Sequence, residues 1–390
     1  MSYSHKLEGT HALSIGDRVY FTRAHKLGDY WYVWTTTINS YIDIFRLEYD
    51  YTVTHLTWMQ STGRGHAWGA TWADSSDNLF LVTSTGIGTG GALRAFRYNG
   101  QQINELTSIN IGFSPDAGVV WEDPEDTSVI NILVALDATL RFYRYDKETE
   151  SFSLVTSISL RANSTRCAGN EIPIWKDGNR YLIALIEVHE SEFRNFRTVI
   201  YQLENDTLSH VYTDDIRSIG LGGSTRYYSI ERESERLILI SGIAADQQPE
   251  AVSGGVNIYL LKWNPLSETI TKKQTYTYES YSHNLEGIWL APTGHIRLWQ
   301  CEQQAKNVTE YDVDLNIIEP IHATINQGTS GSVDGFTFPD YDEHDDHRVL
   351  LTTSWGHLLV FRLSLLVVPP ILSAAQVNNT IEVSWTYPEE

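Results

Sequence analysis

A short residue pattern recurs seven times along the chain, and this repetition constrains the fold more than any other feature. The copies are IDIFRLE around Phe45, LRAFRYN around Phe96, LRFYRYD around Tyr143, TVIYQLE around Tyr201, IYLLKWN around Leu261, VTEYDVD around Tyr311 and LLVFRLS around Phe361. Their spacings are 51, 47, 58, 60, 50 and 50 residues. A period of about 50 residues made of short strands is typical of repeats that contain four antiparallel strands. The pattern excludes helical solenoids.

The repeat therefore predicts an all-β fold, a seven-bladed β-propeller of four-stranded antiparallel blades over residues 1–366. The clearest blade has strands at Gly118–Asp123, Ile130–Leu136, Leu140–Asp146 and Phe152–Leu160. Most first strands carry an aromatic residue at one position, and we expect these side chains to pack between blades because aromatic residues dominate core energetics. These residues are Trp72, Trp121, Trp175, Trp289 and Phe338.

A second repeat links the amino terminus to a distant segment. Ser2–Phe21 and Ser280–Trp299 share the motif SYSH-x-LEG, which we expect at the connection from a fourth strand to the next first strand. The fourth strand of the seventh blade is less evident. Either Leu365–Leu372 supplies it, or Met1–Ser4 does so from the other end of the chain.

Residues 367–390 have a different pattern, with Pro369 and Pro370, an apolar strand, a turn at Asn378 and Asn379, and then IEVSWT with Trp385. This segment resembles the start of a fibronectin type III domain, in which a tryptophan occupies the corresponding core position. The resemblance implies that the natural protein continues further, because two strands cannot bury a core. The alternative is a carboxy-terminal tail that closes the seventh blade.

The charge balance limits the partners. Lys and Arg total 28 residues against 49 Asp and Glu, a formal net charge of −21, so we predict neither a nucleic-acid partner nor membrane insertion. The sequence has no signal-peptide pattern, and we expect a soluble chain without an encoded export signal. Cys167 and Cys301 are predicted two blades apart, which argues against a disulfide framework.

Ionisable residues recur where strands would meet the mouth of a central channel. The functional interpretation is a polar or metal-binding funnel that recognises a sugar, peptide or cation. The structural interpretation is that repeated His and Glu side chains satisfy buried polar groups within each blade, and repetition favours it. The candidate residues are His5, Glu8, His66, Asp116, Glu171, Arg226, His283, Glu286 and Asp334.

Two other features could bind ligands. The acidic run Pro339–His347 could hold Ca²⁺ or a transition metal through Asp342, Glu343, His344, Asp345 and His347, although a solvated acidic turn accounts for it more simply. It is placed on the face opposite the channel mouth, and no other cofactor is predicted. The insertions Gly86–Gly91 and Gly242–Gly255 should enlarge the ligand face.

The chain lacks catalytic-triad, Cys-x-x-Cys, Asp-box, kelch and WD signatures. An unmarked propeller followed by fibronectin-like strands resembles surface-displayed proteins of virions, phage tails and bacterial exteriors. This resemblance implies a non-enzymatic structural or binding module, within a larger symmetric assembly, that recognises a glycan or protein partner through a propeller face. One alternative is a carbohydrate-active hydrolase or lyase with its acid and base among Glu8, Glu171, Glu286 and Asp334. Another is a cytoplasmic scaffold that binds a peptide.

Overall fold

The computed structural model of the chain is all-β and is built from repeated antiparallel sheets. It describes residues 2–12, 19–37, 39, 41–48, 50–62, 65–85, 90–113, 115, 117–136, 138–160, 164–168, 172–189, 196–213, 221–232, 235–244, 256–278, 284–290, 296–302, 307–313, 318–320, 325–326, 336–337, 347–354, 357–366, 371–377 and 380–386.

Three four-stranded sheets come first along the chain. The first sheet contains β2 (Val19–Leu27), β3 (Tyr30–Thr37), β4 (Tyr41–Leu47) and β5 (Val53–Gln60). The second contains β6 (Gly65–Ala73), β7 (Leu79–Thr85), β8 (Ala92–Tyr98) and β9 (Ile103–Asn110). The third contains β10 (Ala117–Asp123), β11 (Asp126–Leu136), β12 (Thr139–Asp146) and β13 (Ser151–Ser159).

The next three sheets have five, four and five strands. The fourth sheet contains β14 (Ser164–Ala168), β15 (Ile174–Asp177), β16 (Arg180–His189), β17 (Phe196–Glu204) and β18 (Thr207–Thr213). The fifth contains β19 (Leu221–Arg232), β20 (Glu235–Ala244), β21 (Val256–Asn264) and β22 (Thr269–Tyr278). The sixth contains β23 (Asn284–Leu290), β24 (Ile296–Glu302), β25 (Asn307–Val313), β26 (Ile318–Pro320) and β27 (Ile325–Asn326).

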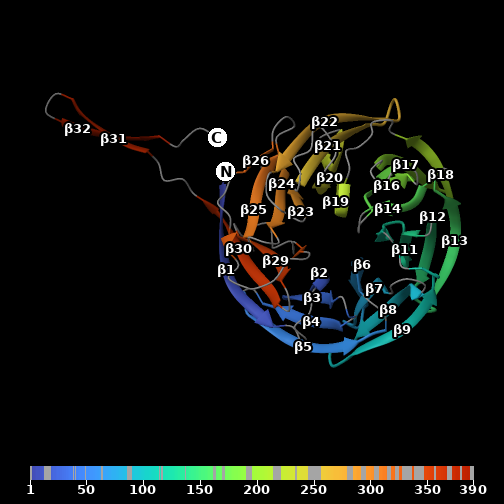
Figure 1. Cartoon of the computed structure of the whole chain (residues 1–390). Helices are drawn as coiled ribbons and strands as arrows, with labels where there is room; N and C mark the ends of the chain where they lie inside the picture. Colours follow the sequence, from blue (N-terminus) through green and yellow to red (C-terminus); the bar gives the residue numbers. More distant parts are fainter. Residues whose placement is uncertain are drawn as a thin grey trace.

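The sheets follow one another around a ring, as Figure 1 shows. The first strands β2 and β6 lie toward the centre, and the last strands β5, β9, β13, β18 and β22 lie on the outside. In the first, second, third and fifth sheets the spatial order of the strands equals their order in the sequence. This repeated arrangement is consistent with propeller-like blades.

The closing sheet joins the two ends of the chain. Its order is β1 (Ser2–Ala12), β30 (His357–Leu366), β29 (His347–Ser354) and β28 (Phe336–Thr337). Of the two sources considered for its fourth strand, the structure has the amino-terminal one, which is longer than the expected Met1–Ser4. The other candidate segment, Leu365–Leu372, does not form one strand. Its first two residues end β30 at Leu366, and its last two belong to β31 (Ile371–Val377), which pairs with β32 (Thr380–Thr386). The β31–β32 hairpin lies outside the ring (Figure 1).

The repeated sequence pattern coincides with a repeated backbone irregularity. The pattern lies on the third strand of each sheet. In the first five sheets, the outer strand has one extra residue opposite the central residue of the pattern, and this extra residue forms a β-bulge. The extra residues are Leu56, Leu106, Val155, Val211 and Lys273. In the closing sheet, Glu8 of β1 is the extra residue opposite Phe361. Because a bulge increases the local twist, its repetition bends the outer strands of these six sheets at the same place.

The packing expected for the first-strand aromatics is confirmed for three residues. Trp72 lies 5.8 Å from Tyr145 of the third sheet, Trp121 lies 5.5 Å from Tyr181 of the fourth, and Trp175 lies 6.4 Å from Trp263 of the fifth, measured between ring centroids. Each indole therefore fills the space between its own sheet and the next. The side chains of Trp289 and Phe338 lie outside the described residues.

Candidate functional site

The structure places the residues predicted at the channel mouth on different strands of the sheets. Three of them, His66 on β6, Arg226 on β19 and Glu286 on β23, lie on the first strand of a sheet. His5 and Glu8 lie instead on β1, the outermost strand of the closing sheet, because this segment supplies the missing fourth strand. The candidates outside the described residues are Asp116, Glu171, His283 and Asp334.

The other candidate features are mostly outside the described part of the chain. Residues 339–346 of the acidic run are not described, and His347 is the first residue of β29. Residues 86–89 and 245–255 of the glycine-containing insertions are not described either. Among the residues that are described, no three His, Cys, Asp or Glu side chains are grouped as metal ligands. In the same part of the chain, no helix has the length and apolar character needed to cross a membrane.

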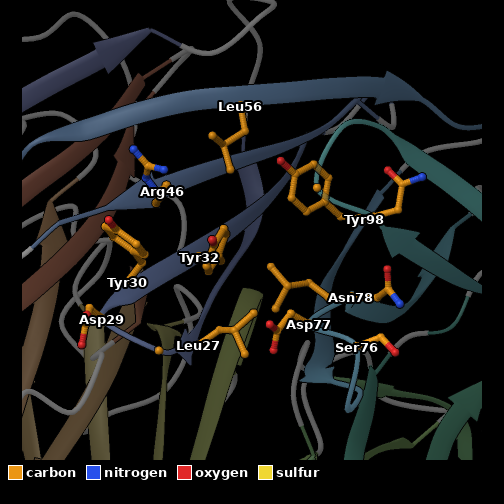
Figure 2. A pocket seen from close by; sticks show the side chains of 14 residues that line it. Leu27, Asp29, Tyr30, Tyr32, Arg46, Leu56, Ser76, Asp77, Asn78 and Tyr98 are labelled. Atoms are coloured by element: carbon orange, nitrogen blue, oxygen red, sulfur yellow. The ribbon is translucent and has the colours of Figure 1, made fainter.

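A pocket of about 650 Å³ lies between the first and second sheets, within the range of about 300–1,000 Å³ that is usual for small-molecule sites. It is formed where the β2–β3, β6–β7 and β8–β9 turns meet, which is the opposite end of the sheets from the expected channel mouth. Figure 2 shows side chains of the two sheets facing each other across it. The lining residues are Leu27, Gly28, Asp29, Tyr30, Tyr32, Arg46, Leu56, Ser76, Asp77, Asn78, Leu79, Tyr98, Asn99 and Gly100.

The β6–β7 turn is held by Asp74. Its Oδ1 atom accepts hydrogen bonds from the backbone N–H groups of Ser76 (2.8 Å) and Asn78 (3.0 Å), and its Oδ2 atom accepts one from Asn78 Nδ2 (2.8 Å). Partial burial raises the pKa of the Asp74 carboxyl, but these hydrogen bonds outweigh it, so the pKa is lowered overall. The turn therefore presents Ser76, Asp77 and Asn78 to the pocket in a fixed geometry.

The β8–β9 turn is held in a similar way by Asn99, whose Oδ1 atom accepts hydrogen bonds from the backbone N–H groups of Gln101 (3.1 Å) and Gln102 (3.0 Å). Gly100 has a φ of 86°, in the left-handed region that glycine adopts without steric cost. A glycine at this position leaves the adjoining wall of the pocket without a side chain.

Arg46 and three tyrosines supply the charged and aromatic surfaces. The guanidinium carbon of Arg46 lies 4.6 Å from the centre of the Tyr30 ring, and Arg46 Nη2 also forms an ion pair with Glu48 of the same sheet (2.8 Å). Burial raises the pKa of the Tyr98 hydroxyl, nearby Tyr32 raises it further, and Arg46 acts in the opposite direction. Tyr30 is 38% exposed, which leaves part of its ring accessible to a ligand.

No protein-family model matches this chain, and neither does any curated protein. The chemistry of the pocket is therefore argued from its own residues. Aliphatic and aromatic surfaces from Leu27, Leu56 and Tyr30 adjoin carboxylates and amides that hydrogen-bond hydroxyl groups. This combination suits a small polar ligand with an apolar ring face.

Sequence reasoning did not find this pocket. The local signals, Gly28 with Asp29 and the Asp74–Asn78 segment, indicate turns and not a site, because such residues are common in any tight connection. Arg46 belongs to the repeated pattern, and Arg97, Arg144 and Arg362 occupy the same position in other copies. Only the position of the neighbouring sheet shows which turns face Arg46.

Proposed function

We propose that the protein is a seven-bladed β-propeller that acts as a non-enzymatic binding module and holds a saccharide in the pocket between its first two sheets. The blade number is supported by the seven copies of the sequence pattern and by seven sheets of four or five strands in a ring. The β31–β32 hairpin, with Trp385 on β32, is proposed as the start of a fibronectin-like domain. Display on a virion, a phage tail or another exposed surface remains part of this proposal.

The observation that carries the saccharide proposal is the composition of the pocket. Tyr30, Tyr32 and Tyr98 offer aromatic surface, and sugar rings have apolar C–H faces that pack on such rings. Asp29, Asp77 and other polar groups offer acceptors and donors for hydroxyl groups. The pocket also opens on the turns of two sheets, where a glycan chain can enter from solvent.

Binding to a glycan array that contains neutral, sulfated and carboxylated saccharides tests the proposal. The bound class is then measured by isothermal titration calorimetry with the wild type, Tyr30→Ala and Trp58→Ala. Trp58 is a matched control because it is an aromatic residue with 47% exposure on β5 and does not line the pocket. We expect Tyr30→Ala to weaken binding by about tenfold or more, as for a central aromatic contact, and Trp58→Ala to leave it unchanged.

Two results would overturn the proposal. If no saccharide binds, or if Trp58→Ala weakens binding as much as Tyr30→Ala, the pocket is not a saccharide site. If mass spectrometry finds that the bound saccharide is cleaved during long incubation, and the cleavage persists across independent preparations, the hydrolase or lyase alternative replaces the binding module.

A further inference from the structure

Ion pairs connect neighbouring sheets on the face of the ring where the pocket lies. Arg97 of β8 reaches Glu150 of the third sheet (3.6 Å), and Arg144 of β12 binds both carboxylate oxygens of Asp206 in the fourth (2.8 and 2.6 Å). The fourth sheet reaches the fifth through Arg180, which contacts Glu268 at 2.7 Å. We call each of these contacts an inter-sheet clasp.

The basic and the acidic partners of the clasps come from recurring positions. Arg97 and Arg144 directly follow the central residue of the repeated pattern. In the fourth sheet this position is Gln202, whose Oε1 atom accepts a hydrogen bond from Arg180 (2.7 Å). The acids lie in the turn between the third and fourth strands of the next sheet, at residues with left-handed backbone: Glu150 (φ 50°), Asp206 (φ 62°) and Glu268 (φ 50°). The same turn position therefore supplies a carboxylate at three successive junctions.

The junction between the first and second sheets differs. Arg46 occupies the position of Arg97 and Arg144, but the facing turn is Asn99–Gln102, and its left-handed residue is Gly100. Among the residues that the structure describes, the ion pair of Arg46 is with Glu48 in its own sheet. The pocket of about 650 Å³ occupies the space between Arg46 and this turn.

We propose that the ligand of this pocket is a saccharide that carries a carboxylate, and that Arg46 binds the carboxylate in place of the acid that the other junctions supply from their own turns. This inference rests on the proposed saccharide function. A planar guanidinium can hold both oxygens of a carboxylate, as Arg144 does with Asp206. The stacking of Arg46 on Tyr30 orients the guanidinium before the ligand arrives.

Asp77 sets the orientation of such a ligand. It is exposed and repels a carboxylate, so the carboxylate end is directed toward Arg46 and the hydroxyl groups toward Asp77, whereas the exposed Asp29 lies on the same side of the pocket as Arg46 (Figure 2). In Figure 2 Asp77 lies across the pocket from Arg46, which matches this polarity. The net charge of −21 repels an anionic ligand at long range. Physiological salt screens this repulsion beyond about 8 Å, whereas the direct contact with Arg46 persists.

The proposal is tested by building the missing clasp. Gly100→Asp places a carboxylate on the left-handed residue of the turn that faces Arg46, one residue before the counterpart of Asp206, and a Cβ atom at Gly100 meets nothing within 4 Å. Gly100→Asn adds nearly the same bulk and the same backbone strain without the charge. Calorimetry with oligosaccharides that end in glucuronate or N-acetylneuraminate, and with their neutral counterparts, compares the two variants. We expect carboxylated saccharides to bind Gly100→Asp at least about tenfold more weakly than Gly100→Asn.

A second pair of variants tests Arg46 itself. Arg46→Gln should remove the preference for carboxylated over neutral saccharides, whereas Arg97→Gln changes the equivalent arginine of the next sheet and should leave binding unchanged. If carboxylated and neutral saccharides bind the wild type equally, or if Gly100→Asp and Gly100→Asn bind alike, the carboxylate inference is overturned while saccharide binding stands. If no saccharide of either kind binds, the proposed function fails as well.

Discussion

The indole ring of Trp68 in the second sheet lies directly against the α-carbon of Gly118 in the third. Trp68 is buried, and a Cβ atom built on Gly118 would approach its ring carbons closer than the 3.0 Å that real Cβ atoms essentially never cross. Trp68 belongs to β6 and Gly118 to β10. The first strands of neighbouring sheets therefore meet here without room for a side chain on Gly118.

We expect Gly118→Ala to destabilise the fold by about 1–3 kcal/mol, because the added methyl group forces Trp68 or the backbone to move. Chemical denaturation followed by tryptophan fluorescence measures the change. Gly90→Ala is the matched control, since a Cβ atom there meets nothing within 4 Å, and it should change the free energy of unfolding by less than about 0.5 kcal/mol. Equal effects of the two variants would contradict the close packing of Trp68 on Gly118.

The ion pair between Arg144 and Asp206 should contribute only modestly to stability. Its side chains are 35% and 49% exposed, so we expect a coupling free energy of about 0.2–1 kcal/mol from a double-mutant cycle with Arg144→Gln and Asp206→Asn. The coupling should decrease between 0.02 and 0.5 M salt, about the range over which screening becomes strong. A coupling indistinguishable from zero at low salt would show that this clasp does not stabilise the junction.

Ring closure by β1 predicts different consequences for removing the two ends of the chain. Deletion of residues 2–12 removes the partner of β30 and exposes its edge, so we expect a lower thermal midpoint and self-association through the unpaired strand. Deletion of residues 371–386 removes the β31–β32 hairpin, whose strands pair only with each other among the described strands, and should have little effect on the ring. Thermal unfolding and analytical ultracentrifugation compare the two. Equal stability of both deletions would argue against the pairing of β1 with β30.

Acid should weaken the turn that Asp74 holds. Because the pKa of Asp74 in the folded protein is lowered from 3.8, the carboxylate stabilises the fold above that pH, and its contribution is lost as the pH falls through the lowered value. Asp74→Asn should therefore lower the thermal midpoint at pH 7, and its difference from the wild type should shrink below pH 3.8.

Asp77→Asn is the control for Asp74. It removes a charge from the same turn but keeps the acceptor for the N–H groups of Ser76 and Asn78. A loss of stability that is equal for the two variants, or a difference between Asp74→Asn and the wild type that does not decrease as the pH falls below 3.8, would show that the Asp74 hydrogen bonds are not responsible.

The repeated pattern allowed the strands to be predicted because it reflects a local requirement. Phe45, Phe96 and Tyr143 are buried on third strands, and each lies opposite a bulge in the outer strand, so similar surroundings select similar residues. The similarity of the two SYSH-x-LEG copies led to the prediction that they occupy equivalent positions, which is wrong. In both copies the glutamate, Glu8 or Glu286, lies at a bulge, but β1 is an outer strand and β23 a first strand.

The pocket could not be predicted in this way. Asp29 belongs to a turn of the first sheet and Asp77 and Gly100 to two turns of the second, and Asp29 meets the other two only because the two sheets pack side by side. The special position of Arg46 is also invisible locally, since Arg97 and Arg144 stand in the same context. What distinguishes Arg46 is the absence of a carboxylate on the turn that faces it.

The sequence by itself determined the all-β character and the repeated four-stranded unit, because side-chain alternation and strand length depend on neighbours along the chain. The tertiary structure decided that the amino-terminal strand closes the ring, and that a pocket opens where Arg46 faces Gly100. Both depend on which edges and turns meet in space. Edge pairing and packing between sheets join residues that no local pattern connects.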